Sequence, residues 1–113
     1  MMTLATKTRE GITKERFDRL VKEWKETRPP ASSIEKMAMH HAYQQIIGLG
    51  PDAVPLILRE LVFAPAQWFW ALRSITGENP VDEDHRGNVN KMADDWYAWA
   101  KTNGYTKTNG YTL

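Results

Sequence analysis

The chain has 113 residues, which is enough for one domain and too few for two, because domains cluster at roughly 100 to 150 residues. Hydrophobic residues make up 42% of the sequence and five residues are tryptophan, so we expect a core that forms without disulfide support. The absence of cysteine excludes thiolate metal sites and cysteine nucleophiles, and the net charge of +1 argues against strong electrostatic binding of nucleic acid.

The first part of the chain predicts a flexible tail, residues 1–11, and one amphipathic helix over about residues 14–27. Thr13 is the expected N-cap, because its hydroxyl can accept a hydrogen bond from the free amides of the first turn. Pro29 and Pro30 end the helix, since the residue before a proline is pushed out of the helical region. Apolar residues recur on one face of this helix, at Phe17, Leu20, Val21 and Trp24.

The sequence SSIE predicts the start of a second helix that continues to Leu49. It matches a capping box, with Ser32 as the cap and Glu35 bonding back to the amide of that serine. Gly48 and Gly50 end the helix, one of them in the left-handed conformation. The apolar face of the helix consists of Ile34, Ala38, Ala42, Ile46 and Leu49.

The second helix carries two adjacent histidines, His40 and His41. Neighbouring side chains on a helix point about 100° apart, and neither histidine has a second one at the i+4 position, so we expect structural roles and no bound metal. His40 lies on the polar side of the helix with Gln44. These two side chains are therefore candidates for contact with a partner.

Two further helices follow, the first in the sequence GPDAVPLILREL and the second from about Pro65 to Ile75. Pro55 is expected in the first turn of the former, where its missing amide hydrogen costs nothing. The latter ends at Thr76-Gly77. The longest uncharged apolar run, residues 61–72, is too short to span a membrane, so we expect a soluble, cytoplasmic protein.

The fourth helix contains three consecutive aromatic residues, and each could either be buried in the core or lie on a surface that contacts a partner. On a helical wheel Trp68 shares the apolar face with Ala71, Leu72 and Ile75, and Phe69 lies at its flank, so both are expected in the core. Trp70 points to the opposite side, beside Arg73. It either packs beneath another helix or is an exposed contact anchor.

Residues 78–87 are predicted to form an acidic loop, and residues 88–102 a last helix that ends at Asn103-Gly104. The loop sequence DEDHRG matches the opening of a calcium-binding loop, but Arg86 and Ala93 stand where that loop needs oxygen ligands. We expect the acids to cap the last helix at the positive end of its dipole. The hexapeptide KTNGYT occurs twice, at 101–106 and 107–112, and residues 106–113 are expected to form a flexible tail.

No segment shows the alternation of a strand, so the expected fold is all-α, a compact bundle of about five helices within residues 12–105. The sequences IIGLGPDAVPLILREL and PAQWFWALRSITG resemble the turn and helices of a HEAT-type repeat. The resemblance covers residues 32–77 and implies a HEAT-like helix-turn-helix centre. It spans fewer than two repeats, whereas solenoids need about three, so the flanking helices would have to act as caps.

A second resemblance gives no activity. The combination WFWAL..ITGENPV is similar to a group of small bacterial proteins for which we have no assigned role. The chain contains neither the Gly-x-Ser-x-Gly motif of a serine nucleophile nor a glycine-rich phosphate loop, and its acids are expected in solvent. We therefore expect no enzyme activity and no cofactor.

The sequence is consistent with two main classes of function. The first is a small module that binds another protein, as an adaptor, inhibitor or antitoxin-like partner encoded nearby, with Trp70, Arg73, His40 and Gln44 as candidate contacts. The alternative is nucleic-acid binding through Arg16, Arg19, Lys22 and Lys25, although interleaved acids neutralise much of that charge. A homodimer closed by the aromatic residues is a third hypothesis.

Overall fold

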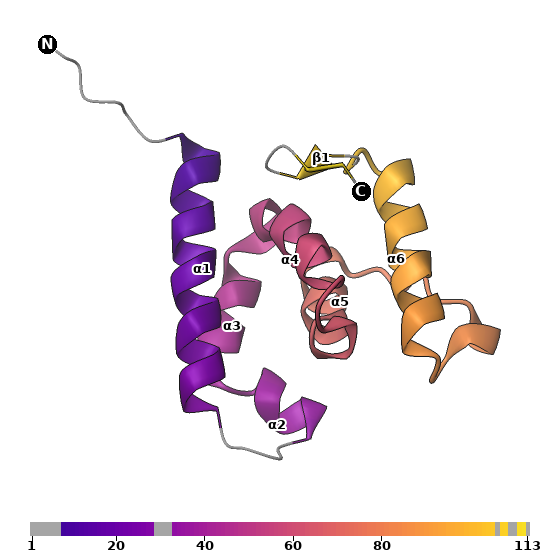
Figure 1. The fold of residues 1–113 in the computed structure, drawn as a ribbon, viewed down its shortest axis with the longest axis horizontal. Helices are drawn as coiled ribbons and strands as arrows, with labels where there is room; N and C mark the ends of the chain where they lie inside the picture. The colour runs from indigo at the N-terminus through magenta and orange to yellow at the C-terminus, as the bar shows by residue number, and fades with distance from the viewer. Residues whose placement is uncertain (1–7, 29–32, 106, 109–110, 113) are drawn as a thin grey trace, which may run out of the picture.

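The computed structural model describes residues 8–28, 33–105, 107–108 and 111–112 of the chain (Figure 1). It confirms the all-α fold class. The α-helices of this part of the chain are α1 (Arg9–Thr27), α2 (Ile34–Ala38), α3 (His41–Gly48), α4 (Val54–Glu60), α5 (Phe69–Thr76) and α6 (Val89–Thr102). Short 3₁₀ turns link them: η1 (Gly50–Ala53), η2 (Pro65–Gln67) and η3 (Glu83–His85).

The second copy of the repeated hexapeptide contains two strands, β1 (Lys107–Thr108) and β2 (Tyr111–Thr112). They pair antiparallel, with Lys107 opposite Thr112 and Thr108 opposite Tyr111. Six residues without apolar and polar alternation gave no signal for a strand, so the sequence predicted a flexible tail over residues 106–113, and for these two strands that prediction was wrong.

The first helix begins five residues earlier than predicted, so residues 9–11 belong to α1 and not to the predicted tail. Thr8, not Thr13, is its N-cap, and the Thr8 hydroxyl accepts a hydrogen bond of 2.9 Å from the amide of Gly11. Thr13 instead lies inside the helix with 9% of its surface exposed. The prediction was wrong because two threonines offer the same capping chemistry, and the apolar stripe starts too late to choose between them. The predicted end is confirmed, since Arg28 is extended.

The predicted second helix is two helices. Ser33 caps α2 by accepting from the amide of Lys36 at 3.1 Å, while the predicted cap, Ser32, lies outside the described residues. The helical hydrogen bonds then stop, because His40 is extended, with φ −61° and ψ 139°. Its imidazole Nδ1 accepts from the amide of Ala42 at 3.0 Å and so caps α3.

Glycines end two elements as the sequence predicts. Gly50 has a φ of 75°, which closes the turn after α3, and Pro55 lies in the first turn of α4. Gly77, with a φ of 71°, ends α5. Asn88 caps α6 by accepting from the amide of Lys91 at 3.1 Å, so the expectation that loop acids cap this helix was wrong.

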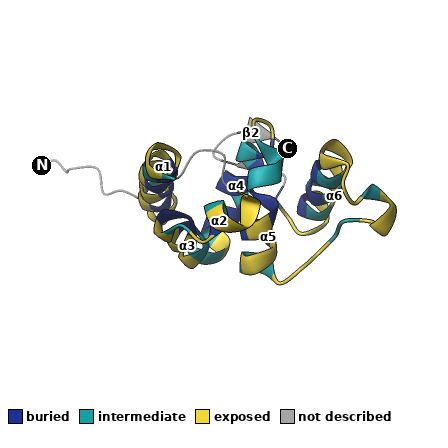
Figure 2. Cartoon of the chain, turned by 90° about the horizontal axis from the view of Figure 1, so that it is seen from below, coloured by how far each residue is buried: buried dark blue, intermediate teal, exposed yellow. Residues whose placement is uncertain are grey.

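The helices stack side by side from α1 through α3 and the α4–α5 pair to α6 (Figure 1). Figure 2 shows buried residues on the sides of the helices that face one another and exposed residues on the outer sides. No described helix has the length and apolar character that a membrane crossing requires.

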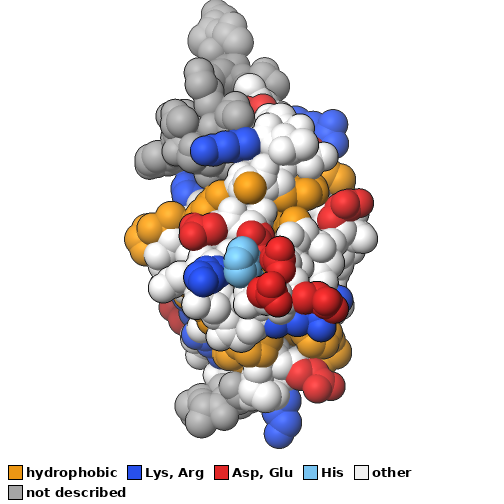
Figure 3. Space-filling view, turned by 90° about the vertical axis from the view of Figure 1, so that its right-hand side faces the viewer, with side chains coloured by type: hydrophobic (Ala, Val, Ile, Leu, Met, Phe, Trp, Pro, Cys, Tyr) orange, Lys and Arg blue, Asp and Glu red, His pale blue; other side chains and the backbone are white. Residues whose placement is uncertain are grey.

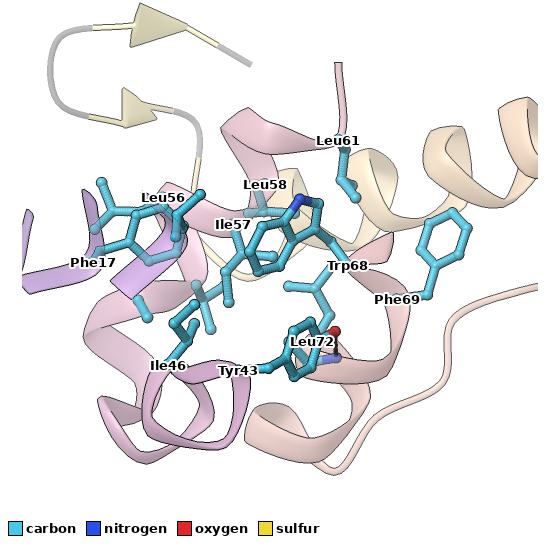
Figure 4. Packing of buried hydrophobic residues seen from close by; sticks show 14 of the residues in the cluster. Phe17, Tyr43, Ile46, Leu56, Ile57, Leu58, Leu61, Trp68, Phe69 and Leu72 are labelled. Carbon is cyan, nitrogen blue, oxygen red and sulfur yellow. Dashed lines mark hydrogen bonds between the residues drawn. The ribbon is translucent and has the colours of Figure 1, made fainter. Parts of the chain in front are cut away.

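Aromatic rings from three helices form the centre of the core (Figure 4). The Trp68 ring lies 5.6 Å from Tyr43, in a stacked arrangement, and 5.3 Å from Trp24, measured between ring centroids. Phe17 of α1 lies 5.9 Å from Trp68. All four side chains are at most 1% exposed. This cluster therefore holds α1, α3 and the start of α5 together.

Candidate functional site

The three consecutive aromatic residues at the start of α5 point in different directions. Trp68 is fully buried and Phe69 is 9% exposed, as predicted. Phe69 points away from Tyr43, toward α6 (Figure 4). Trp70 is 37% exposed, so it is neither covered by another helix nor fully in solvent. The three residues are therefore not one patch, and Trp70 is the member that reaches the surface.

Trp70 lines a cleft of about 500 Å³, which we call the α5–α6 cleft. This volume is in the range of ligand pockets, roughly 300 to 1,000 Å³. The chain turns at Gly77, and the loop that follows brings Asn79 and Val81 to the cleft wall. The lining residues are Ile34, Phe69, Trp70, Arg73, Asn79, Val81, Arg86, Met92 and Trp96.

A second hollow of about 380 Å³ adjoins the α5–α6 cleft. The two share Trp70, Arg73 and Asn79. The second hollow adds Gly77 and Glu78 from the end of α5. Together they form a trough along the exposed side of α5.

The charge of the α5–α6 cleft is positive, although it lies in the acidic part of the chain. Among the described residues, Arg73 and Arg86 are the only charged ones that line it, and neither forms an ion pair there. Two of the nearby carboxylates are used elsewhere. Asp82 accepts from the amide of Asp84 at 2.9 Å, and Asp95 accepts from the amide of Asp82 at 3.1 Å.

His85 links the acidic loop to α6 through a hydrogen bond. Its Nδ1–H donates to Oδ2 of Asp95 at 2.7 Å. This hydrogen bond is the main reason that the pKa of Asp95 is lowered, with the Asp82 amide adding to the effect. Figure 3 shows the α6 side of the molecule, where acidic side chains gather around one histidine. Among the described residues no group of three or more histidines and acids could hold a metal ion.

The other two candidate contacts, His40 and Gln44, do not line the cleft. Both form hydrogen bonds at the junction of α2 and α3: His40 caps α3, and Gln44 Nε2 donates to the carbonyl of Ala38 at 2.7 Å. Nε2 of His40 lies 2.8 Å from the Thr27 hydroxyl, which itself donates to the carbonyl of Glu23. Nε2 must therefore carry the hydrogen, and Nδ1 is free to accept.

The basic residues of α1 lie in solvent with acids among them. Arg16, Arg19, Lys22 and Lys25 are all exposed. Lys25 Nζ is 3.9 Å from a carboxylate oxygen of Glu60 in α4. Asp18 pairs with Lys14 at 2.6 Å. The described basic side chains of α1 thus share their surface with carboxylates, which reduces the field that a phosphate backbone would meet.

Of the residues that line the cleft, Trp70 and Arg73 were candidates from the sequence, whereas the loop residues that complete it were not. Asn79, Val81 and Arg86 lie in the loop between α5 and α6, where no periodic pattern indicates which side chains turn inward. Arg86 did carry one signal, because it is one of only two basic residues between Glu78 and Asp95.

Comparison with known proteins gives no relative: no family model, no curated protein and no solved structure matches the chain.

Proposed function

We propose that the protein is a small, non-enzymatic interaction module that binds another protein at the α5–α6 cleft. The roles that suit such a module are adaptor, inhibitor or antitoxin-like partner. One observation carries the proposal: Trp70, a large aromatic side chain, stays 37% exposed at a cleft whose floor includes the core residues Phe69 and Trp96. Tryptophan and arginine are the residues that most often dominate binding energy at protein interfaces.

The position of Trp70 also supports a preformed binding surface. Its neighbours in sequence, Trp68 and Phe69, are buried in the core and hold the first turn of α5 in place. A side chain on such a rigid element loses little conformational freedom on binding. The HEAT-like resemblance of residues 32–77 adds further support, because stacked helix pairs commonly present a groove to partners.

A photo-crosslinking experiment tests the proposal in the organism that encodes the protein. A photoreactive phenylalanine analogue replaces Trp70 in one variant and Phe63 in a control variant. Phe63 is 76% exposed and does not line the cleft, so it controls for adhesion to any exposed aromatic group. We expect one defined protein adduct from position 70 and none from position 63.

The Trp70→Ala variant provides the second arm. It should keep the helical circular dichroism spectrum and lose capture of the partner identified by crosslinking. Equal crosslinking from both positions, or no adduct from position 70, would contradict the proposed function.

A further inference from the structure

We infer that the segment bound in the α5–α6 cleft is an acidic, apolar peptide of the partner protein. Its carboxylate lies between Arg73 and Arg86, and the apolar side chain next to it packs against Trp70 and the cleft floor. This inference rests on the proposed function and names the chemistry of the partner.

The charge of the cleft argues for an acidic segment. Arg73 and Arg86 reach the cleft from different elements, the first from α5 and the second from the loop after η3. Both are exposed, and no described carboxylate bonds to either. A guanidinium group presents a planar fork that matches a carboxylate, and two unpaired guanidinium groups in one cleft repel each other until an anion joins them.

The floor of the cleft argues that the segment is also apolar. Phe69 and Trp96 are buried beneath it, and Met92 and Val81 are partly buried at its sides. An apolar side chain placed here would remove its own surface and that of Trp70 from water. It would also exclude water from the arginine–carboxylate contact, which strengthens that contact.

The trough along α5 favours a peptide over a compact ligand, and the charges at its two ends favour one orientation of that peptide. The α5–α6 cleft and the second hollow meet at Trp70, Arg73 and Asn79, so an extended segment can occupy both. Glu78 lines only the second hollow. A second acid there would be repelled, so the carboxylate of the peptide belongs at the Arg86 end and a neutral or basic residue at the Glu78 end.

Selection from a random display library tests the inference without a known partner. A library of ten-residue peptides is selected on the full chain, and the best peptide is synthesised and titrated by calorimetry. We expect enriched peptides to place Asp or Glu next to a large apolar residue. Binding should fall at least tenfold in the Arg73→Gln/Arg86→Gln variant and in Trp70→Ala, and should weaken with added salt.

A matched control separates local contact from general charge. Lys91 is exposed in the same acidic part of the chain but does not line the cleft, so Lys91→Gln should leave the affinity within twofold. Replacing the peptide's acid by its amide should give the same loss as the double arginine variant, and combining both changes should add little more.

Each other outcome overturns the inference in a distinct way. Enrichment of neutral or basic peptides that still require Trp70 rejects the acidic segment and leaves the proposed function standing. Enrichment that survives Trp70→Ala rejects the cleft itself. A lack of any enriched peptide rejects the inference, while crosslinking at position 70 decides the proposed function separately. Concentration-dependent dimers in sedimentation that vanish in the double arginine variant assign the cleft to a second copy of the chain.

Discussion

The hydroxyl group of Tyr43 joins α3 to the start of α5. It donates to the carbonyl of Gln67 at 2.8 Å and accepts from the amide of Ala71 at 3.0 Å. The Ala71 amide lies in the first turn of α5, where helical partners are missing, and Trp68 supplies no side-chain cap. Burial raises the pKa of the Tyr43 hydroxyl and so keeps the proton with which it donates. The tyrosine thus acts as the cap of a helix on another element.

Replacing Tyr43 with Phe should destabilise the fold with little change in packing. The substitution leaves the buried Ala71 amide unpaired, so we expect a loss of about 1 to 3 kcal/mol in the free energy of unfolding, measured by urea denaturation. Tyr97→Phe is the matched control, because the Tyr97 hydroxyl makes only a 3.4 Å contact, with the carbonyl of Leu58. An equal loss in both variants would contradict the capping role.

The aromatic triplet shows how far residue-level prediction from the sequence reaches. Helical spacing alone places Trp68 in the core, because it lies on the stripe that any neighbouring helix must cover. Spacing could not decide the exposure of Trp70, which depends on how much of α5 the loop after Gly77 and α6 leave uncovered. Such tertiary contacts have no period in the sequence.

His40 caps the start of α3, as Tyr43 caps the start of α5, and so allows a new helix to begin after α2. With Nδ1 accepting from the Ala42 amide, it stands where Ser, Thr, Asp or Asn is usual. His40→Ala should cost about 1 kcal/mol of stability and speed hydrogen exchange at the Ala42 amide. His40→Asn keeps an acceptor and should recover most of both effects. Exchange at Ala42 that is equally fast in the two variants would reject the cap.

The break between α2 and α3 could not be predicted because the sequence carries a signal for one continuous helix and none for a break. The apolar period continues unbroken from Ile34 to Leu49, which favours one helix. Histidine is not among the residues that usually signal a cap. Helix ends set by glycine were predicted well, at Gly50 and Gly77, because there the backbone conformation that glycine permits decides. The start of α6 near Asn88 was also predicted, but its capping by the Asn88 side chain was not.

The hydrogen bonds of Asp95 hold the loop at residues 82–85 against α6, and they should weaken in acid. Because the pKa of Asp95 is lowered in the folded state, its stabilising effect is fully present above the ordinary carboxyl value of 3.8 and is lost as the pH falls below it. Asp95→Ala should therefore speed exchange of the Asp82 amide at neutral pH and abolish the acid-dependent part of that exchange.

A neighbour of Asp95 on α6 provides the control for the acid experiment. His85 faces Asp95 from η3, and Asp94 lies next to it on α6. Asp94→Ala removes an equal charge and leaves both bonds of Asp95 in place, so it should leave Asp82 exchange nearly unchanged. If the two variants behave alike, net charge and not the Asp95 contact controls the loop.

At the scale of the whole molecule, the basic helix α1 and the acidic loop with α6 lie at opposite ends of the helix stack (Figure 1). Composition along the chain predicted both charged regions, and spacing predicted the all-α class. The placement of Arg86 in the cleft was not predictable, because it results from the path of the loop between two ends of the fold. The sequence therefore predicts only part of the candidate site: Trp70 and Arg73 of α5 could be predicted, and the loop residues could not.

The buried cluster that extends from α1 to α6 predicts that the molecule unfolds as one unit. Phe17 of α1 and Trp96 of α6 are 1% and 0% exposed at opposite ends of this cluster. Replacing either with Ala should cost about 3 to 5 kcal/mol, because each leaves a large cavity. In urea, circular dichroism and tryptophan fluorescence should give the same midpoint in each variant, lowered together. If Trp96→Ala released α6 in a separate early transition while α1 to α5 kept the original midpoint, the cleft would lie between two independent units. A partner bound there would then stabilise the docking of α6 as well as its own contacts.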